Sequence, residues 1–199
     1  MSLSLIFAMF SFSLAMSISP GPVNMIILSS GVDYGAKKTF PYVSGATIGF
    51  TLLLLFVGFF FKKFIEAYPF LLSFITVAGV LYIIYMGYKI ASSHPEIKVK
   101  KTDIPKFYEG FLLQWLNPKA WIACVSGVSI FSSHEGYGTF LTFVSLYFVV
   151  CYASLAIWAF LGEKISFLLK SQFRLRLFNL LTGLLLIVTA IYIGYTHFI

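Results

Sequence analysis

The sequence has few charged residues. Asp, Glu, Lys and Arg make up 11% of its 199 residues, whereas a soluble domain averages about 25%. Hydrophobic residues make up 59%, and the mean hydropathy is +0.92. We therefore expect an integral membrane protein that forms one transmembrane domain over residues 1–199, in contact with the lipid bilayer and without a soluble domain.

Acidic residues are the scarcest charged residues, with 7 against 14 basic ones. None lies near the middle of an apolar segment, because Asp33, Glu109 and Glu163 all lie near segment ends. The sequence therefore shows no carboxylate of the kind that relays protons in transporters. The net charge of +7 does not indicate nucleic-acid binding, since the basic residues lie in short connectors where they set membrane orientation.

Cysteine and histidine are also rare. Cys124 and Cys151 lie inside apolar segments without CxxC or metal-ligand spacing, so we expect them to be packing residues. A membrane thiol–disulfide carrier would need a cysteine in the first apolar segment, which has none. A divalent-metal exporter stays the alternative function, although it needs ligands at mid-membrane and the histidines lie at segment ends or in connectors: His94, His134 and His197. We predict no enzyme activity, metal or cofactor.

Six apolar segments are each long enough to cross a membrane, which takes roughly 20 residues for ~30 Å of hydrocarbon. We therefore predict an all-α fold of six transmembrane helices. The segments cover residues 3–30, 39–61, 69–91, 108–132, 139–161 and 175–197.

Proline interrupts the first and fourth segments near their middle, at Ser19-Pro20-Gly21-Pro22 and at Asn117-Pro118-Lys119. Both motifs favour a helix that stops and restarts. In the first, Ser19 or Gly21 can cap the new helix, with Pro22 as its first residue. In the second, Asn117 can cap and Pro118 can follow. A restarted helix presents free N–H groups and partial positive charge inside the membrane, which is costly unless a polar group binds there.

Basic residues predict the orientation. If the N-terminus is outside, the inner connectors carry eleven basic residues and the outer connectors two, Lys62 and Lys63. Because positive charge accumulates on the cytoplasmic side, we expect both termini outside. The eleven are Lys37, Lys38, Lys89, Lys98, Lys100, Lys101, Lys106, Lys164, Lys170, Arg174 and Arg176.

The two halves of the chain look related. The broken segment comes first in each half, and the third and sixth segments share a glycine followed by a Tyr-x-Gly-Tyr motif, at 85–88 and 192–195. Three crossings per half are an odd number, so the second half must be inverted in the membrane. We predict a three-plus-three inverted repeat with halves of about 1–91 and 106–199.

Glycines predict where helices pack closely. Gly45 and Gly49 form a small-xxx-small pair on the second segment, which lets another helix approach. Gly31 and Gly35 precede that segment, and we expect them to shape the tight connector there.

Inversion brings the two restarted helices together. The half-helix that starts at Pro22 runs inward and the one that starts at Pro118 runs outward, so their positive ends meet near the membrane centre. Such a pair of ends is suited to a small anionic group such as a carboxylate. The alternative is a pair of ordinary proline kinks, which transmembrane helices tolerate.

Lys119 is the most informative charge. It lies about eleven residues into the fourth segment, or ~16 Å deep at 1.5 Å per residue, too deep for its side chain to reach the surface. Its expected partner is a substrate carboxylate, the alternative being backbone carbonyls that the Pro118 break frees. Asn24, Gln114 and Asn117 are expected to hydrogen-bond the substrate, although such amides also join helices.

The motifs together resemble those of the LysE/RhtB-type amino-acid exporters, over nearly the whole chain and in the same order. The resemblance rests on Pro20-Gly21-Pro22-x-Asn24, Gly31, Gly35, Gly45-x-x-x-Gly49, Ala78-Gly79-x-x-Tyr82-x-x-Tyr85-x-Gly87-Tyr88-Lys89 and Phe111 through Asn117-Pro118-Lys119-Ala120. Residues 87–93 and the Asn at position 24, where many members have Asp, are similar to the cysteine and O-acetylserine exporters of this family.

The resemblance implies a bacterial inner-membrane protein that exports small amino acids or their derivatives, driven by the proton gradient. We expect a neutral substrate; Asn24, where many members have Asp, removes a possible partner for a substrate ammonium and a candidate proton carrier. Pro20, Gly21, Pro22 and Pro118 shape the expected site, with Tyr82 and Tyr85 as candidate wall residues whose alternative role is packing. The sequence leaves the oligomeric state open, with a homo-oligomer as one option, and a passive channel is also open.

Overall fold

The computed structural model describes residues 2–61, 74, 77, 80–81, 83–85, 87–88, 90–92, 104–131, 137–166 and 172–198, and every regular element that it describes is helical. The elements are α1 (Leu3–Ile18), α2 (Pro22–Tyr34), α3 (Ala36–Phe56) with a π-helical turn η1 (Val57–Phe61), α6 (Phe107–Leu116), α7 (Pro118–Phe131), α8 (Tyr137–Ser166) and α9 (Gln172–Phe198). The predicted all-α fold is confirmed, and these helices follow the predicted segments closely.

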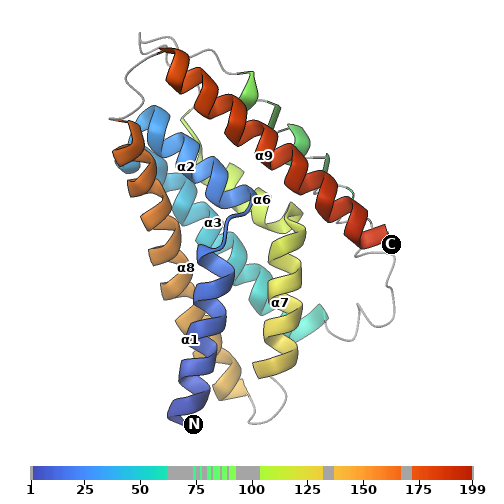
Figure 1. Cartoon of the computed structure of the whole chain (residues 1–199). Coiled ribbons are helices and arrows are strands. Elements are labelled where there is room, and N and C mark those ends of the chain that lie inside the picture. The colour runs from blue at the N-terminus through green and yellow to red at the C-terminus, as the bar shows by residue number, and fades with distance from the viewer. Residues whose placement is uncertain are drawn as a thin grey trace.

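The helices run in alternating directions. In Figure 1, α1 and α2 lead from the N-terminal end to the opposite end, and α3 returns, whereas α6 and α7 run back toward the N-terminal end and α8 leaves it. A broken helix followed by a long helix therefore occurs twice, with opposite directions. α9 begins at the end opposite the N-terminus and slants beside α2.

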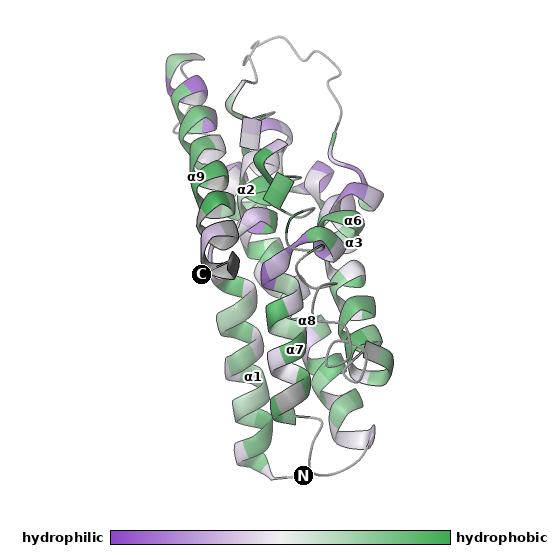
Figure 2. Ribbon diagram, turned by 90° about the vertical axis from the view of Figure 1, so that its right-hand side faces the viewer, coloured by the Kyte–Doolittle hydropathy of each residue, from purple (hydrophilic) through white to green (hydrophobic). Residues whose placement is uncertain are grey.

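Two described helices are long and apolar enough to cross a membrane alone, Ala36–Phe60 and Tyr137–Ser166. The bent pair α1–α2 makes a third if it counts as one span. Figure 2 shows hydrophobic residues along the body of the helices and hydrophilic ones toward the end opposite the N-terminus. The total of six spans stays a prediction.

Carboxylates near segment ends cap helices. The Lys106 N–H donates to Glu109 Oε2 at 2.9 Å at the start of α6, and the Ala36 N–H donates to Glu163 Oε2 at 3.1 Å at the start of α3. Both acids therefore satisfy backbone donors that a helix start leaves without an intrahelical acceptor. Gly35 joins α2 to α3 with a φ of 82°, a conformation that favours glycine, as its place in the connector predicted.

Glycines let backbones touch at two crossings. A Cβ atom at Gly45 or Gly49 of α3 would overlap the backbone of α6 at Phe107 or Phe111, so this small-xxx-small pair packs a helix as predicted. Gly31 does not shape the connector but lies against the backbone of α8, where Gly162 in turn faces α2. These contacts fix α3 on α6 and α2 on α8, beside the site described next.

Candidate functional site

The first break separates α1 from α2 by a bend of 59°. α1 ends at Ile18, Gly21 is the N-cap of α2, and Pro22 is its first residue, as the sequence predicted. Because proline has no N–H, its place there costs the new helix no hydrogen bond.

The carbonyl groups at the end of α1 all have partners. The Ser19 N–H donates to the Ala15 carbonyl at 3.3 Å, and the Ser19 hydroxyl donates to the Met16 carbonyl at 3.2 Å. Ser19 therefore supplies the donors for two of the carbonyls that the end of α1 leaves without an intrahelical partner.

The next two carbonyls are bound by side chains of other helices. Asn24 of α2 donates through Nδ2 to the Ser17 carbonyl at 2.9 Å, and Trp158 of α8 donates through Nε1 to the Ile18 carbonyl at 3.2 Å. Unpaired carbonyls would be costly inside a membrane, so these side chains stabilise the interruption itself.

The second break is capped by one residue. Asn117 accepts the Lys119 N–H on Oδ1 at 3.2 Å, and its carbonyl accepts the N–H groups of Ala120 at 2.9 Å and Trp121 at 3.3 Å. Pro118 has no N–H to satisfy. The backbone N–H groups at the start of α7 therefore all have acceptors, and the predicted cap at Asn117 is confirmed.

The start of α2 is more open. Met25 donates to the Gly21 carbonyl at 3.0 Å, but the N–H groups of Val23 and Asn24 precede the first residue with an acceptor inside the helix. Both residues line the cavity described below. The two breaks therefore differ in their free backbone donors. The start of α2 has N–H groups available to a ligand, whereas those at the start of α7 are already hydrogen-bonded.

Lys119 joins the two breaks. Its ammonium donates to the Ser19 carbonyl at 2.7 Å, to the Ser19 hydroxyl at 2.8 Å and to the Pro20 carbonyl at 3.4 Å, more than 95 residues away in sequence. A cation is favourable there because the C-terminal end of a helix carries partial negative charge. Neither sequence hypothesis named this partner, which is the end of α1 rather than the carbonyls near Pro118.

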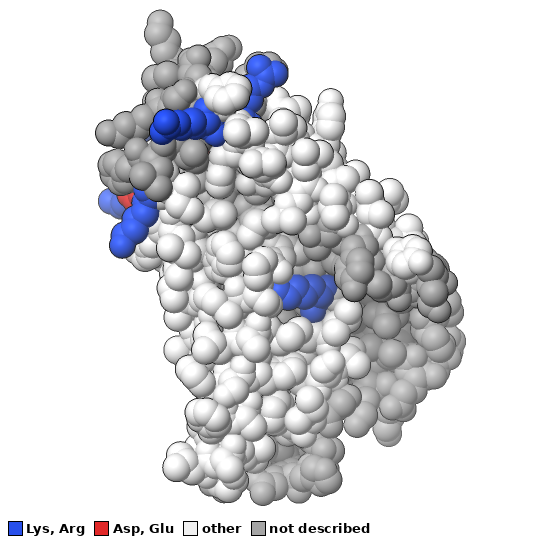
Figure 3. Space-filling model, viewed as in Figure 1, with Lys and Arg blue, Asp and Glu red and all other residues white. Residues whose placement is uncertain are grey.

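Gly21 gives the lysine room. A Cβ atom at Gly21 would lie 3.1 Å from both Cδ and Nζ of Lys119 and 3.7 Å from Oδ1 of Asn24. The lysine stem therefore lies directly on the backbone of the first break. Figure 3 shows basic side chains gathered toward one end of the molecule and a separate basic patch in a hollow halfway down this face.

A cavity opens beside these groups. Gln114, Asn117 and Lys119 line it from α6, the second break and α7, and Asn24 lines it from α2. Gln114 is 5% exposed, and its side chain makes no hydrogen bond to the residues that the structure describes. Its amide can both donate and accept a hydrogen bond, so the cavity is suited to a polar ligand.

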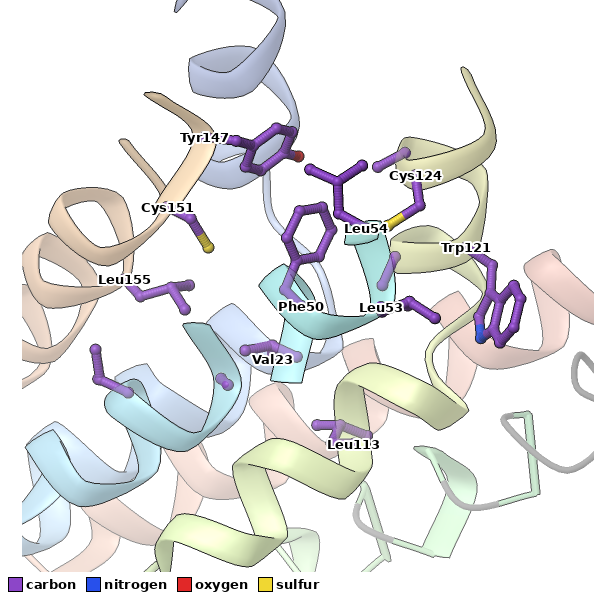
Figure 4. Packing of buried hydrophobic residues seen from close by; sticks show 14 of the residues in the cluster. Val23, Phe50, Leu53, Leu54, Leu113, Trp121, Cys124, Tyr147, Cys151 and Leu155 are labelled. Atoms are coloured by element: carbon purple, nitrogen blue, oxygen red, sulfur yellow. The ribbon is translucent and has the colours of Figure 1, made fainter. Parts of the chain in front are cut away.

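The opposite wall of the cavity comes from residues that the sequence did not predict for the site. Phe50 of α3 stacks on Tyr147 of α8 with ring centroids 4.5 Å apart, and the Cys151 sulfur points toward the space beside Phe50 (Figure 4). Cys151 is thus both a packing residue, as expected, and a wall residue, while Cys124 lies in the core. Ser17, Val23, Met16, Ala120, Ala123 and Leu155 complete the lining.

The two tyrosines expected in the wall lie elsewhere or outside the described residues. Tyr85 is 57% exposed and does not line the cavity, and its segment packs on α9, where Gly183 meets Gly87 and Ala91. Tyr82 lies outside the described residues. Pro20, Gly21, Pro22 and Pro118 flank the cavity as parts of the two breaks.

Comparison with known proteins decides the family. The model of the LysE type translocator family matches residues 14–197, which include both breaks and every residue of the cavity. The chain belongs to the LysE family. The expected resemblance is confirmed, and the fold just described is that of a LysE-type membrane translocator, not of an enzyme.

Curated relatives of this LysE-family chain match along their full length. A cysteine/O-acetylserine efflux protein of Escherichia coli K12 is 25% identical over 203 residues, covering 98% of this chain and 100% of the relative. The protein of the same name from Escherichia coli O157:H7 is 26% identical with the same coverage. No solved structure matches this LysE-family chain. The relatives support amino-acid efflux across a bacterial inner membrane by a multi-pass protein.

Proposed function

We propose that the chain exports small neutral amino acids or their derivatives, with the substrate carboxylate bound between Lys119 and the start of α2. One observation carries this proposal: among the described residues that line the cavity the single charged group is a cation, and it lies beside a helix start whose N–H groups lack intrahelical acceptors. A carboxylate needs several donors and a positive field, and this corner supplies both.

The amide side chains of the cavity can bind both charged groups of an amino acid. Asn24 uses Nδ2 on the Ser17 carbonyl, which leaves Oδ1 to accept from the substrate ammonium. Asn117 uses Oδ1 on the Lys119 N–H, which leaves Nδ2 to donate to the carboxylate. Gln114 has both ends of its amide available to the substrate. The described lining offers the ammonium neutral acceptors and no carboxylate, which favours a zwitterion over a substrate with a second positive charge.

The cavity does not favour the alternative of a divalent cation. Lys119 would repel a metal ion, and the oxygen ligands nearest to it are neutral amides and carbonyls. The relatives are named for cysteine and O-acetylserine, both of which are neutral amino acids. We infer that the proton gradient drives export, as in the exporters that the chain resembles.

Export can be tested in cells. We expect a strain that expresses the chain to resist toxic neutral amino acids and analogues, because export lowers their internal concentration. Growth is compared with that of an empty-vector strain, and release of labelled serine or cysteine from preloaded cells is measured with and without a protonophore. Equal growth and release in both strains would contradict export, and release that a protonophore leaves unchanged would contradict the driving force.

We further propose an inverted repeat with both termini outside. The described Lys106 and Lys164 are exposed at the end opposite the N-terminus, which fits a cytoplasmic end. Lys106→Cys and Gly138→Cys, at opposite ends, test this orientation with a membrane-impermeant thiol reagent in intact cells. We expect position 138 to react at once and position 106 only after the membrane is opened; the reverse pattern would overturn the orientation. The unsubstituted chain is the control.

A further inference from the structure

The hydroxyl of Ser17 differs from several other hydroxyls of these helices. Ser13 donates to the Met9 carbonyl at 2.7 Å, Thr47 to the Val43 carbonyl at 3.0 Å, and other helical hydroxyls also bond one turn back along their own helix. Ser17 is 7% exposed, yet its oxygen has no hydrogen-bond partner among the described residues. A buried hydroxyl without a partner calls for an explanation, and a ligand that completes the bond is one.

The position of Ser17 is fixed by its surroundings. It lies in the last turn of α1, where Asn24 holds its carbonyl at 2.9 Å. The Tyr147 hydroxyl and the Cys151 thiol of α8 lie beside its hydroxyl. All three residues line the cavity. A small cluster of hydroxyl and thiol groups therefore lies in the wall, apart from the lysine.

We propose that Ser17, together with Tyr147 and Cys151, forms a subsite for a polar atom on the substrate's side chain, a hydroxyl or thiol group or an acyl oxygen. This inference rests on the proposed function and adds the class of side chain that the site selects. The carboxylate lies at Lys119, and the side chain points toward α8. A substrate with a hydrogen-bonding atom completes the Ser17 bond, and an aliphatic substrate of the same shape leaves it unmade.

Such a subsite discriminates strongly because its own groups are left unpaired by the wrong substrate. Serine and 2-aminobutyrate form the sharpest pair, since a methyl group replaces the hydroxyl with little change in size. We expect the chain to transport serine faster than 2-aminobutyrate by on the order of tenfold.

The experiment measures uptake of labelled serine and of labelled 2-aminobutyrate into inside-out membrane vesicles that contain the full chain. Ser17→Ala is expected to remove most of the preference by slowing serine transport, with little change for 2-aminobutyrate. Ser13→Ala is the matched control, because this buried serine lies one turn earlier on α1 and bonds to its own helix. It should leave the ratio of the two rates unchanged.

The outcomes separate the subsite from export itself. An unchanged ratio in Ser17→Ala, or equal rates in the wild-type chain, would overturn the subsite and leave export standing. Vesicles that take up neither compound would overturn the proposed function as well. If Ser17→Ala does not accumulate in the membrane, Tyr147→Phe asks the same question, because it removes one hydroxyl and keeps the ring that stacks on Phe50. A smaller preference for serine is then expected, and an unchanged one would overturn the subsite.

Discussion

Replacing Lys119 with methionine is expected to abolish measurable export while the protein still folds and inserts. The methionine keeps most of the apolar stem and removes the ammonium that donates to Ser19 and, by our proposal, to the substrate carboxylate. A hydrogen bond to a charged group contributes about 1.5–3 kcal/mol, so substrate affinity should fall roughly 10- to 100-fold. Release of labelled substrate from cells and a thermal-shift titration of purified protein with amino acids measure the two effects.

Stability should fall less than export. Loss of the ammonium leaves the Ser19 carbonyl without its donor, which costs about 1–3 kcal/mol and lowers the melting temperature. Lys164→Met is the control, because Lys164 is exposed at the end of α8, away from the cavity. Full export by Lys119→Met would contradict the carboxylate-binding role. A protein that keeps its substrate-induced thermal shift would show that Lys119 serves only to hold the end of α1.

Replacing both Pro20 and Pro22 with alanine should also abolish export, but without loss of stability. The variant permits one continuous helix, in which the N–H groups of residues 21, 22 and 23 bond the carbonyls of residues 17, 18 and 19. Those carbonyls would no longer need Asn24, Trp158 and Lys119. Proline costs about 3 kcal/mol in a helix interior relative to alanine, so melting should be unchanged or higher. Substrate should no longer raise the melting temperature.

The second break provides the comparison. Pro118→Ala is expected to have a smaller effect, because Asn117 still accepts three N–H groups and holds the break without the proline. Export and substrate-dependent melting are measured on both variants and on the wild-type chain. An unchanged substrate response in the double alanine variant would refute binding at the start of α2 and leave the first break as a packing feature.

The positions of the breaks could be predicted from local rules. A cap residue followed by proline has the same consequence in any helix, so Gly21 with Pro22 and Asn117 with Pro118 indicated where α2 and α7 begin. What the lysine contacts could not be predicted, because Ser19 lies 100 residues away in sequence and a lysine stem can reach several acceptors.

The residues of the other cavity wall could not be predicted from the sequence either. In a membrane helix, residues that face lipid and residues that face the interior are both apolar, so sequence does not separate the faces. Leu52 is 44% exposed and Leu53 is fully buried, although they are neighbours of the same type. Phe50, Tyr147 and Cys151 therefore carried no signal that distinguished them from packing residues. Ser17 offered a weak one, as a hydroxyl close to a break.

The three side chains that hold the end of α1 differ in mechanical character. Asn24 has a short side chain and Trp158 a rigid one. Each would therefore lose its hydrogen bond to α1 if α2 or α8 moved by about an ångström. Lys119 has a flexible four-carbon stem, so its ammonium can follow Ser19 while α7 slides by several ångströms. The end of α1 is therefore held more tightly to α2 and α8 than to α7, so we expect α7 to move first relative to it.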